Sequence, residues 1–275
     1  MKSRRNKVKI GIIGCGAIGS RIAYGIQKDF KNVCQLNGLY DIDQTIAKQL
    51  AKKLSLNNVV KRSITELLKS CDCMVEAVSA KNTRSLIRQA LKAKKDVLSM
   101  SVGKLLNATD LFRLANQNKC RFLLPSGAIA GIDAIKAASL VGIDTITLTT
   151  RKPPSGFYGN SYLLGKGVDL SKIKKEAVLF EGDVATAIKF FPRNINVAAT
   201  LALASKCRKK IIVRILTSPK YTMNSHEIDL TGKFGHIRTE TNNVVCPDNP
   251  KTSYLAVLSG LQTLKQYCGG VIIGT

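Results

Sequence analysis

The sequence predicts an α/β protein, with a doubly wound parallel sheet first and a second, mixed α/β domain after it. Two observations favour this fold class. Short apolar stretches alternate with helical patterns between residues 8 and 125, which is typical of a parallel sheet covered by helices. Beyond Pro125, polar and apolar residues alternate over longer stretches, as in sheets with one buried face.

The elements of the first domain (residues 1–125) follow from these patterns. Apolar and β-branched runs indicate strands, and an apolar residue every three or four positions, such as Ile18, Ile22 and Ile26, indicates a helix. We expect right-handed crossovers between the strands. The predicted order is strand 8–13, helix 17–28, strand 34–40, helix 44–54, an extended piece at 59–60, helix 63–70, strand 73–77, helix 83–93, strand 96–99, helix 107–118 and strand 121–125.

The second domain is placed at residues 126–249. An alanine-rich loop leads into a helix, and alternating stretches predict antiparallel strands and a hairpin with its turn at 231–233. A small, apolar helix is expected before residue 205. A final helix, about 251–267 within the C-terminal segment 250–275, is expected to pack back on the first domain.

Composition narrows the class of protein. The chain has 275 residues, 45% of them hydrophobic, enough for a sizeable core. No apolar run approaches the ~20 residues of a membrane span, and the basic N-terminal stretch lacks the apolar region of a signal peptide. We therefore expect a soluble, cytoplasmic protein that binds no membrane.

Neither the cysteines nor the charge indicates a special site. The eight cysteines are scattered without a C-x-x-C pair, which favours reduced thiols and no metal site. The net charge of +25 is spread along the whole chain, and only 5% of residues are aromatic. A solvated basic surface that attracts anions is therefore favoured over a nucleic-acid site.

A glycine motif predicts a dinucleotide site of the Rossmann type. It follows the first strand and opens the first helix, and Asp41 ends the second strand at about the expected spacing of ~20 residues. Such a turn places a pyrophosphate on the helix N-terminus, and the carboxylate accepts hydrogen bonds from a ribose. Asp41 favours NAD over NADP, although Asp43 and Lys48 leave NADP possible. The cofactor-binding residues expected here are Gly14, Gly16, Ala17, Ile18, Gly19 and Asp41.

Other segments give less specific signals. Ala77 and Ser79 follow the third strand and could run beside the cofactor, or belong to an ordinary loop. The histidines are His226, at the start of an alternating strand, and His236, near a turn. A lone histidine is often structural, and the pattern alone leaves that interpretation open for His226. The ordinary pKa of histidine suits proton transfer near neutrality, so His226 is also the candidate for acid–base catalysis.

Two asparagines before the small, apolar helix have two interpretations. Asn194 and Asn196 could be helix caps. Alternatively, their amides could contact a nicotinamide carboxamide or a substrate.

Taken together, seven blocks resemble the L-aspartate dehydrogenase family. They occur in this order and span most of the chain: GIIGCGAIG, VEAVS, PSGAIAGIDAI, TLTTRKPP, FPRNINVAATLALA, NSHEIDLTGKFG and NPKTSYLA. The resemblance implies a second domain like that of dihydrodipicolinate reductase, which carries catalysis and dimerisation. It also implies NAD(P)-dependent oxidation of L-aspartate to iminoaspartate, reversible as amination of oxaloacetate, for de novo NAD biosynthesis.

The resemblance also assigns residues. It implies that His226 is the catalytic histidine and that Ala130 and Asn196 contact the cofactor. It further implies a homodimer formed through the second domain's sheet. The two carboxylates of aspartate need cationic or amide donors, for which the candidates are Asn194, His226, Lys251, Thr252 and Ser253, with Arg151 and Lys152.

Two other functions remain open from the sequence. One is another two-domain NAD(P)-dependent oxidoreductase, of the homoserine dehydrogenase or dihydrodipicolinate reductase type, which would share the glycine turn. The other is a regulator that binds NAD and nucleic acid. That class predicts a basic helix-turn-helix or arm, which the sequence does not contain.

Overall fold

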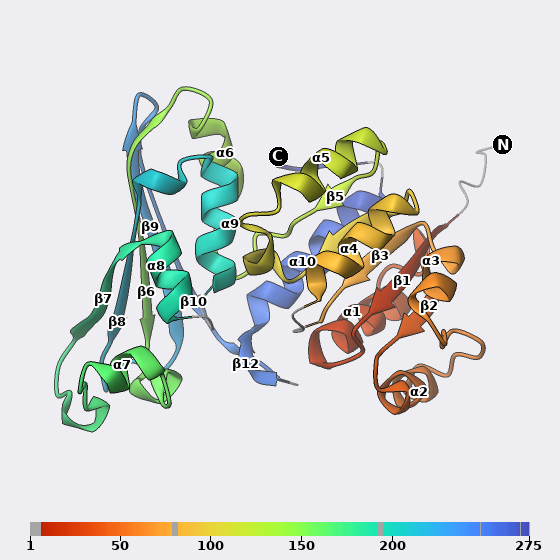
Figure 1. The fold of residues 1–275 in the computed structure, drawn as a ribbon, viewed down its shortest axis with the longest axis horizontal. Helices are drawn as coiled ribbons and strands as arrows, with labels where there is room; N and C mark the ends of the chain where they lie inside the picture. Colours follow the sequence, from red (N-terminus) through yellow and green to blue (C-terminus); the bar gives the residue numbers. More distant parts are fainter. Residues whose placement is uncertain (1–6, 79–81, 192–194, 248, 270, 275) are drawn as a thin grey trace. The chain divides into compact units, whose positions relative to one another are not determined.

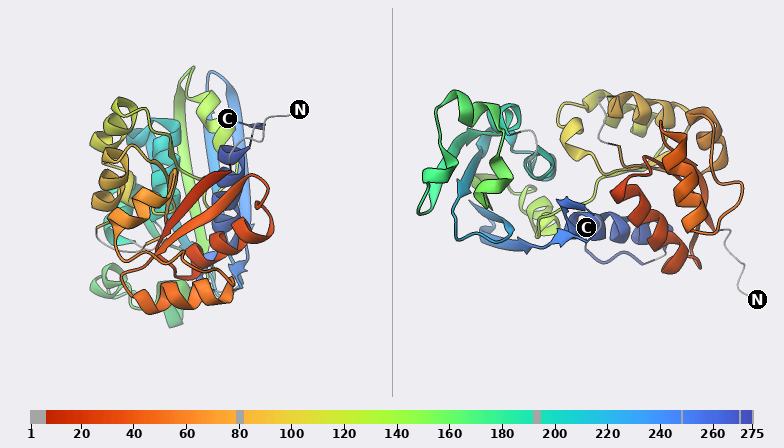
Figure 2. Two further views of the ribbon diagram at one scale, coloured as in Figure 1. Left: turned by 90° about the vertical axis from the view of Figure 1, so that its right-hand side faces the viewer. Right: turned by 90° about the horizontal axis from the view of Figure 1, so that it is seen from below.

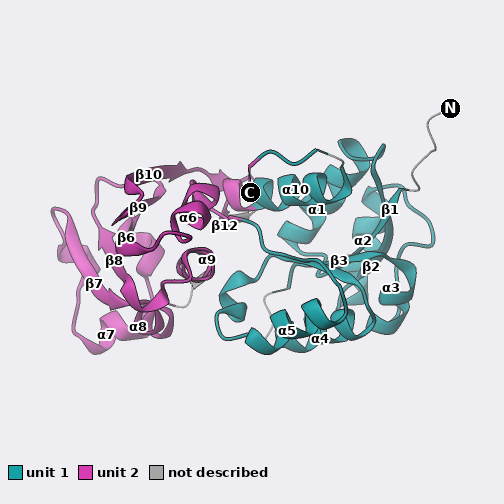
Figure 3. Ribbon diagram, turned by 90° about the horizontal axis from the view of Figure 1, so that it is seen from above, with its two compact units in different colours: residues 1–125, 257–273 teal, residues 126–256, 274–275 magenta. Residues whose placement is uncertain are grey.

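The computed structural model describes residues 7–78, 82–191, 195–247, 249–269 and 271–274. The chain divides into two compact units (Figure 3). Unit 1 comprises residues 1–125 and 257–273, and unit 2 comprises residues 126–256 and 274–275.

Unit 1 is a parallel sheet whose strands lie in the order β2-β1-β3-β4-β5. Each neighbouring pair of strands is parallel. The fold class predicted for this part of the chain is confirmed. Its strands and helices are β1 (Val8–Ile13), α1 (Ala17–Lys28), β2 (Cys34–Tyr40), α2 (Gln44–Lys53), α3 (Ile64–Ser70), β3 (Cys73–Glu76), α4 (Thr83–Lys92), β4 (Asp96–Ser99), α5 (Thr109–Gln117), β5 (Phe122–Leu123) and α10 (Tyr254–Cys268).

Helices cover both faces of this sheet (Figures 2 and 3). On one face, Ile22 of α1, Leu50 of α2 and Leu264 of α10 share a buried core with Ile10 and Ile12 of β1. A separate core on the other face joins α3, α4 and α5 to the sheet. Burial on both faces explains why the strands read as continuous apolar runs.

Helix α10 belongs to unit 1 from Val257 onward, although it comes from the end of the chain. A methyl group on Gly25 of α1 would come within 2.4 Å of the Leu261 side chain, so glycine lets the two helices approach closely. The Tyr267 hydroxyl donates to Asp96 Oδ2 at 2.7 Å, at the start of β4. α10 therefore completes a core whose other members lie in the first 100 residues.

Unit 2 is built on a mixed sheet with the strand order β10-β9-β6-β8-β7 (Figure 1). β6 pairs parallel with β8 and antiparallel with β9. A separate pair, β11 and β12, is antiparallel. The elements are α6 (Ile132–Ala138), β6 (Ile143–Lys152), α7 (Ser161–Gly165), β7 (Ala177–Asp183), α8 (Val184–Phe190), α9 (Ile195–Ser205), β8 (Ile211–Thr217), β9 (Asn224–Gly232), β10 (Gly235–Asn243), β11 (Val245–Cys246) and β12 (Asn249–Ser253).

The two faces of the unit 2 sheet differ. One face packs against the helices and buries Leu148, Val213 and Ile228. On the other face, which we call the open face, Ile212 is 47% and Val178 52% exposed. The polar side chains of β6, β9 and β10 that alternate with the core residues lie on this open face.

Several predicted elements after residue 125 differ in the structure. The final helix begins at Tyr254 and ends at Cys268, because residues 249–253 pair with β11 as a strand. The hairpin turn lies at 233–234 rather than at 231–233, because the ladder of β9 and β10 continues to Gly232 and Gly235. The pairing of β6 with β8 is parallel rather than antiparallel. β7 and α8 were not predicted.

In the part of the chain that the structure describes, no helix has the length and apolar character needed to cross a bilayer.

Candidate functional site

The glycine turn joins β1 to α1 at the carboxyl edge of the unit 1 sheet. Gly14 has φ +91°, and a methyl group there would come within 2.6 Å of the Ala77 carbonyl oxygen. A methyl group on Gly19 would come within 1.8 Å of the Gly14 carbonyl oxygen. At both positions, therefore, only glycine permits the turn and the approach of helix to strand.

Gly16 is different, because the space beside it is open. A methyl group on Gly16 would meet no atom within 4 Å, and the residue is exposed. Gly16 occupies the N-cap position of helix α1, and within the described chain no side chain forms a capping hydrogen bond to the amides of the first turn. Ala17 and Ile18 form its first turn and are partly buried. The uncapped amides and the helix dipole favour an anion at this end.

Asp41 lies directly after β2 and contacts the glycine turn. Its Oδ2 accepts a hydrogen bond from the Cys15 amide at 2.7 Å, and its Oδ1 accepts one from the Asp43 amide at 3.0 Å. The carboxylate is half-buried and held by backbone on both oxygens. The structure thus brings Asp41 and the glycine turn together.

Ala77 follows β3 and lies against Gly14. Its amide donates to the Ile13 carbonyl at 2.9 Å, which continues the pairing of β3 with β1. Ser79 lies outside the described residues.

His226 lies on β9 in unit 2, on the face covered by helices, and is 4% exposed. Its neighbour across the ladder is Thr150 of β6. The Thr150 hydroxyl and His226 Nδ1 are hydrogen-bonded at 3.1 Å. If the hydroxyl donates, the imidazole carries its proton on Nε2.

Burial changes the protonation of His226. Burial, together with the positive charge of Lys152, lowers the pKa of the imidazole to about 3. The pKa is lowered because a buried imidazolium cation loses its hydration. The expectation of a pKa near neutrality is therefore corrected. The imidazole is neutral at pH 7.

The loop 126–131, which contains Ala130, is held by threonines of β10. The Thr241 hydroxyl donates to the Ala128 carbonyl at 2.9 Å and lies 3.3 Å from the His226 carbonyl. The Thr239 hydroxyl lies 3.4 Å from the Ala130 carbonyl. The β10 threonines therefore connect the Ala130 loop to the strand of His226.

The remaining predicted residues are placed as follows. Asn196 is exposed in the first turn of α9, and Asn194 lies outside the described residues. Thr252 and Ser253 are partly buried on β12. Lys251 lies on the same strand, and its side chain is not described. His236 is exposed and bonds to Asp229 at 3.0 Å.

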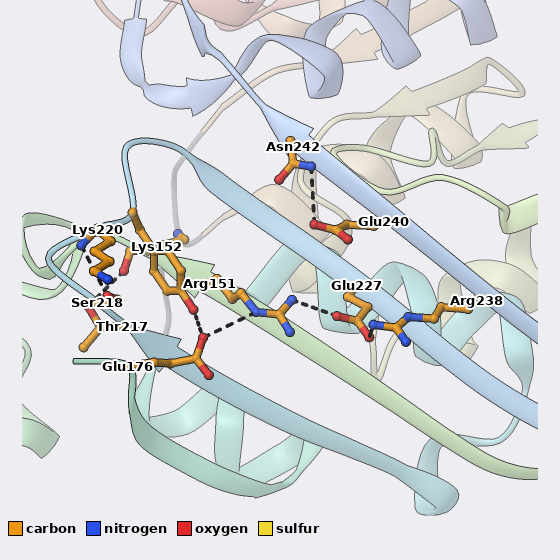
Figure 4. A network of polar contacts seen from close by, with 11 residues as sticks. Arg151, Lys152, Glu176, Thr217, Ser218, Lys220, Glu227, Arg238, Glu240 and Asn242 are labelled. Carbon is orange, nitrogen blue, oxygen red and sulfur yellow. Dashed lines mark hydrogen bonds and ion pairs between the residues drawn. The ribbon is translucent and has the colours of Figure 1, made fainter.

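The side chain of Arg151 lies on the open face of the sheet, whereas that of its neighbour Thr150 lies on the face covered by helices. Its Nη1 lies 2.8 Å from Glu227 Oε2, and its Nε lies 3.9 Å from Glu176 Oε2 (Figure 4). Arg238 Nη2 contacts the other oxygen of Glu227 at 2.8 Å. The guanidinium that was a candidate for a substrate carboxylate is therefore paired with carboxylates of the protein.

Sequence reasoning missed two groups of buried polar residues. Thr150 was hidden in a stretch of threonines, and only its register beside His226 distinguishes it. Glu76 and Ser99, which are both fully buried, form a cluster with the partly buried Ser101 in unit 1. A charged residue ending an otherwise apolar strand was the available signal. Among the described residues, no group of three or more His, Cys, Asp or Glu could hold a metal ion.

Two family models match the chain. The model described as "Aspartate dehydrogenase, C-terminal" matches residues 133–267. The model described as "Homoserine dehydrogenase, NAD binding domain" matches residues 14–125. The boundary between the two matches lies close to the boundary between the two units.

Whole-length relatives are also found. An L-aspartate dehydrogenase of Methanosarcina barkeri is 44% identical over 98% of this chain and 100% of its own length. One of Methanosarcina mazei is likewise 44% identical over the same shares. The crystal structure of aspartate dehydrogenase from Thermotoga maritima covers 98% of this chain and 100% of its own, at a TM-score of 0.73 and 24% identity. At that identity, the likeness to the crystal structure shows the fold alone.

Proposed function

Because the chain belongs to the L-aspartate dehydrogenase family, we propose that it oxidises L-aspartate to iminoaspartate with a pyridine nucleotide, and that it can run in reverse to aminate oxaloacetate. The full-length relationship to the Methanosarcina L-aspartate dehydrogenases carries this proposal. We further propose that the reaction serves de novo NAD biosynthesis in the cytoplasm. The buried, neutral His226 in unit 2 and the glycine turn in unit 1 are the chemical features that support the proposed oxidation of aspartate.

The residues of unit 1 fit a dinucleotide. The open space beside Gly16 and the uncapped start of α1 suit a pyrophosphate, and Asp41 presents a carboxylate that suits ribose hydroxyls. We propose NAD as the preferred cofactor, because a 2′-phosphate would face the negative charge of Asp41. In unit 2 we assign Ala130 and Asn196 to the cofactor. When bound, NAD supplies the hydride acceptor.

The protein's own residues supply proton transfer and substrate binding. Oxidation of the amine requires loss of its protons, and the neutral imidazole of His226 can accept one. The positive charge of Lys152 acts on the imidazole of His226, and Lys152 can pair with a substrate carboxylate. A carboxylate bound beside the imidazole would raise its pKa from about 3, which makes it a better base with substrate present. Thr252 and Ser253, with Lys251 and Asn194, are the further substrate candidates.

The activity is tested by following absorbance at the NADH band with a panel of amino and hydroxy acids, and with both NAD and NADP. We expect L-aspartate with NAD to give the largest kcat/KM. Homoserine belongs in the panel because unit 1 matches a homoserine dehydrogenase family. Turnover of homoserine without turnover of aspartate would replace the proposed substrate.

The role of His226 is tested in the same assay. We expect His226→Asn to lose most of kcat, by at least about a hundredfold, as expected for removal of an acid–base group. Asparagine can keep the hydrogen bond to Thr150, and binding of NADH should stay within about twofold. Full turnover by this variant would contradict the assignment.

A further inference from the structure

A buried carboxyl group lies at the end of β3 in unit 1. Glu76 is 0% exposed, and the other residues of β3 are Cys73, Met74 and Val75, all of them buried. A carboxyl group in such surroundings is costly unless hydrogen bonds compensate for the lost hydration. Burial raises the pKa of Glu76 although its hydrogen bonds act to lower it. Core packing alone would favour an apolar residue here.

The hydrogen bonds of Glu76 lead to the ends of two strands. Ser99, the last residue of β4 and the ladder partner of Glu76, donates its hydroxyl to Oε2 at 2.5 Å. The Val78 amide donates to Oε1 at 3.0 Å. The Ser101 hydroxyl lies 2.9 Å from the same oxygen. Each carboxyl oxygen is therefore engaged by residues near the carboxyl edge of the sheet.

Val78 is held through both of its peptide groups. Its amide bonds to Glu76, and its carbonyl oxygen lies 2.8 Å from the Ser101 hydroxyl. Val78 and Ala77 in turn lie directly behind the glycine turn: a methyl group on Gly14 would come within 2.8 Å of Val78 Cγ1 and 2.6 Å of the Ala77 carbonyl oxygen. Ala77 and Val78 are therefore packed closely against the glycine turn.

We propose that Glu76, Ser99 and Ser101 form a clamp that positions the glycine turn for the dinucleotide by fixing Val78 behind it. Glu76 is a positioning residue in this proposal, since it acts through Val78 and touches no cofactor. The inference rests on the proposed binding of a dinucleotide by unit 1. It adds residues that lie at the ends of β3 and β4 rather than in the turn itself.

The test measures the affinity of the full-length chain for NADH by fluorescence titration. Glu76→Met keeps the length of the side chain and removes both acceptors, and we expect about tenfold weaker binding, the scale of one lost hydrogen bond to a charged group. Ser101→Ala keeps the carboxyl group and releases the Val78 carbonyl, and we expect about threefold to tenfold weaker binding. Glu76→Gln keeps an acceptor for Val78 and should stay within about threefold of the unsubstituted chain.

Kinetics separate positioning from a general loss of structure. In Glu76→Met, KM for the dinucleotide should rise about tenfold, while kcat and KM for the amino acid stay unchanged. Tyr267→Phe is the matched control, because it removes a carboxylate hydrogen bond at the opposite end of β4. It should leave NADH affinity unchanged.

The outcomes are distinguishable. Ser101→Ala and a folded Glu76→Met that both bind NADH as tightly as the unsubstituted chain would overturn the clamp alone. If Glu76→Met does not fold, Ser101→Ala decides by itself. An equal loss in Tyr267→Phe would also overturn the clamp, because the effect would then be general. If the unsubstituted chain binds neither NADH nor NADPH, the proposed function fails and the clamp fails with it.

Discussion

At the scale of single residues, the pKa and the hydrogen bonds of a side chain depend on the residues that the fold places around it. His226 looks like an ordinary proton-transfer group in the sequence, but burial and Lys152 lower its pKa to about 3. Thr150 bonds to Nδ1, and this contact could not be foreseen, since the two residues are 76 positions apart. Their pairing depends on the register of β6 against β9.

The lowered pKa predicts how stability changes in acid. The unfolded chain takes up a proton on His226 as pH falls below about 6.5, whereas the folded chain does so only near pH 3. Relative to His226→Asn, the unsubstituted chain should therefore lose about 2 kcal/mol of unfolding free energy between pH 7 and pH 5. Urea unfolding at several pH values measures this. Parallel pH curves for the two proteins would show that the histidine is not buried as described.

Asp41 is a residue whose role the sequence suggests and whose contacts the structure adds. Asp41→Asn keeps the shape and an acceptor for the Cys15 amide, but removes the negative charge. We expect NAD to bind about tenfold more weakly and NADP to lose less or to gain, because the charge no longer repels a 2′-phosphate. Titration with both reduced cofactors tests this. Equal losses would mean that Asp41 does not distinguish the two.

At the scale of elements, periodicity identified the strands and helices of unit 1 because each is locally consistent. β1 is a run of apolar residues, and α1 carries isoleucines at helical spacing. In unit 2 the prediction was weaker. β7 has a mixed burial pattern at the edge of its sheet, so its sequence lacks a clean alternation, and α8 follows without a turn between them.

Local sequence patterns also do not predict whether two neighbouring strands pair parallel or antiparallel. An alternating stretch shows that one face is buried, but it does not show which strand lies beside it. β6 has one parallel and one antiparallel neighbour, and both arrangements bury the same side chains. The choice follows from the path of the chain through α7, β7, α8 and α9.

At the scale of the whole molecule, the open face of the unit 2 sheet is where we propose that a second copy of the chain binds. The family resemblance implies such a dimer, and two observations support it. Ile212 and Val178 are half-exposed on this face. The face also carries arginines and glutamates in alternation, including Arg214 with Glu181 at 2.9 Å, which suits pairing with an identical surface.

The dimer is tested by light scattering coupled to gel filtration. Ile212→Asp would bury an unpaired charge in the interface, so we expect it to shift the mass from dimer to monomer. Leu140→Asp is the matched control, since Leu140 is 82% exposed and follows α6 rather than lying on the sheet. It should remain a dimer. If the unsubstituted chain is monomeric at micromolar concentration, the proposed dimer is wrong.

The sequence by itself determined the alternation of strands and helices, the glycine turn with Asp41, and the family resemblance, which the full-length relatives confirm. These are properties of short segments or of ordered motifs. The tertiary structure decided the pairing of Thr150 with His226, the pairing of Arg151 with Glu227, and the cluster around Glu76. Each joins residues from different strands, and only the register of a folded sheet brings such residues within hydrogen-bond distance.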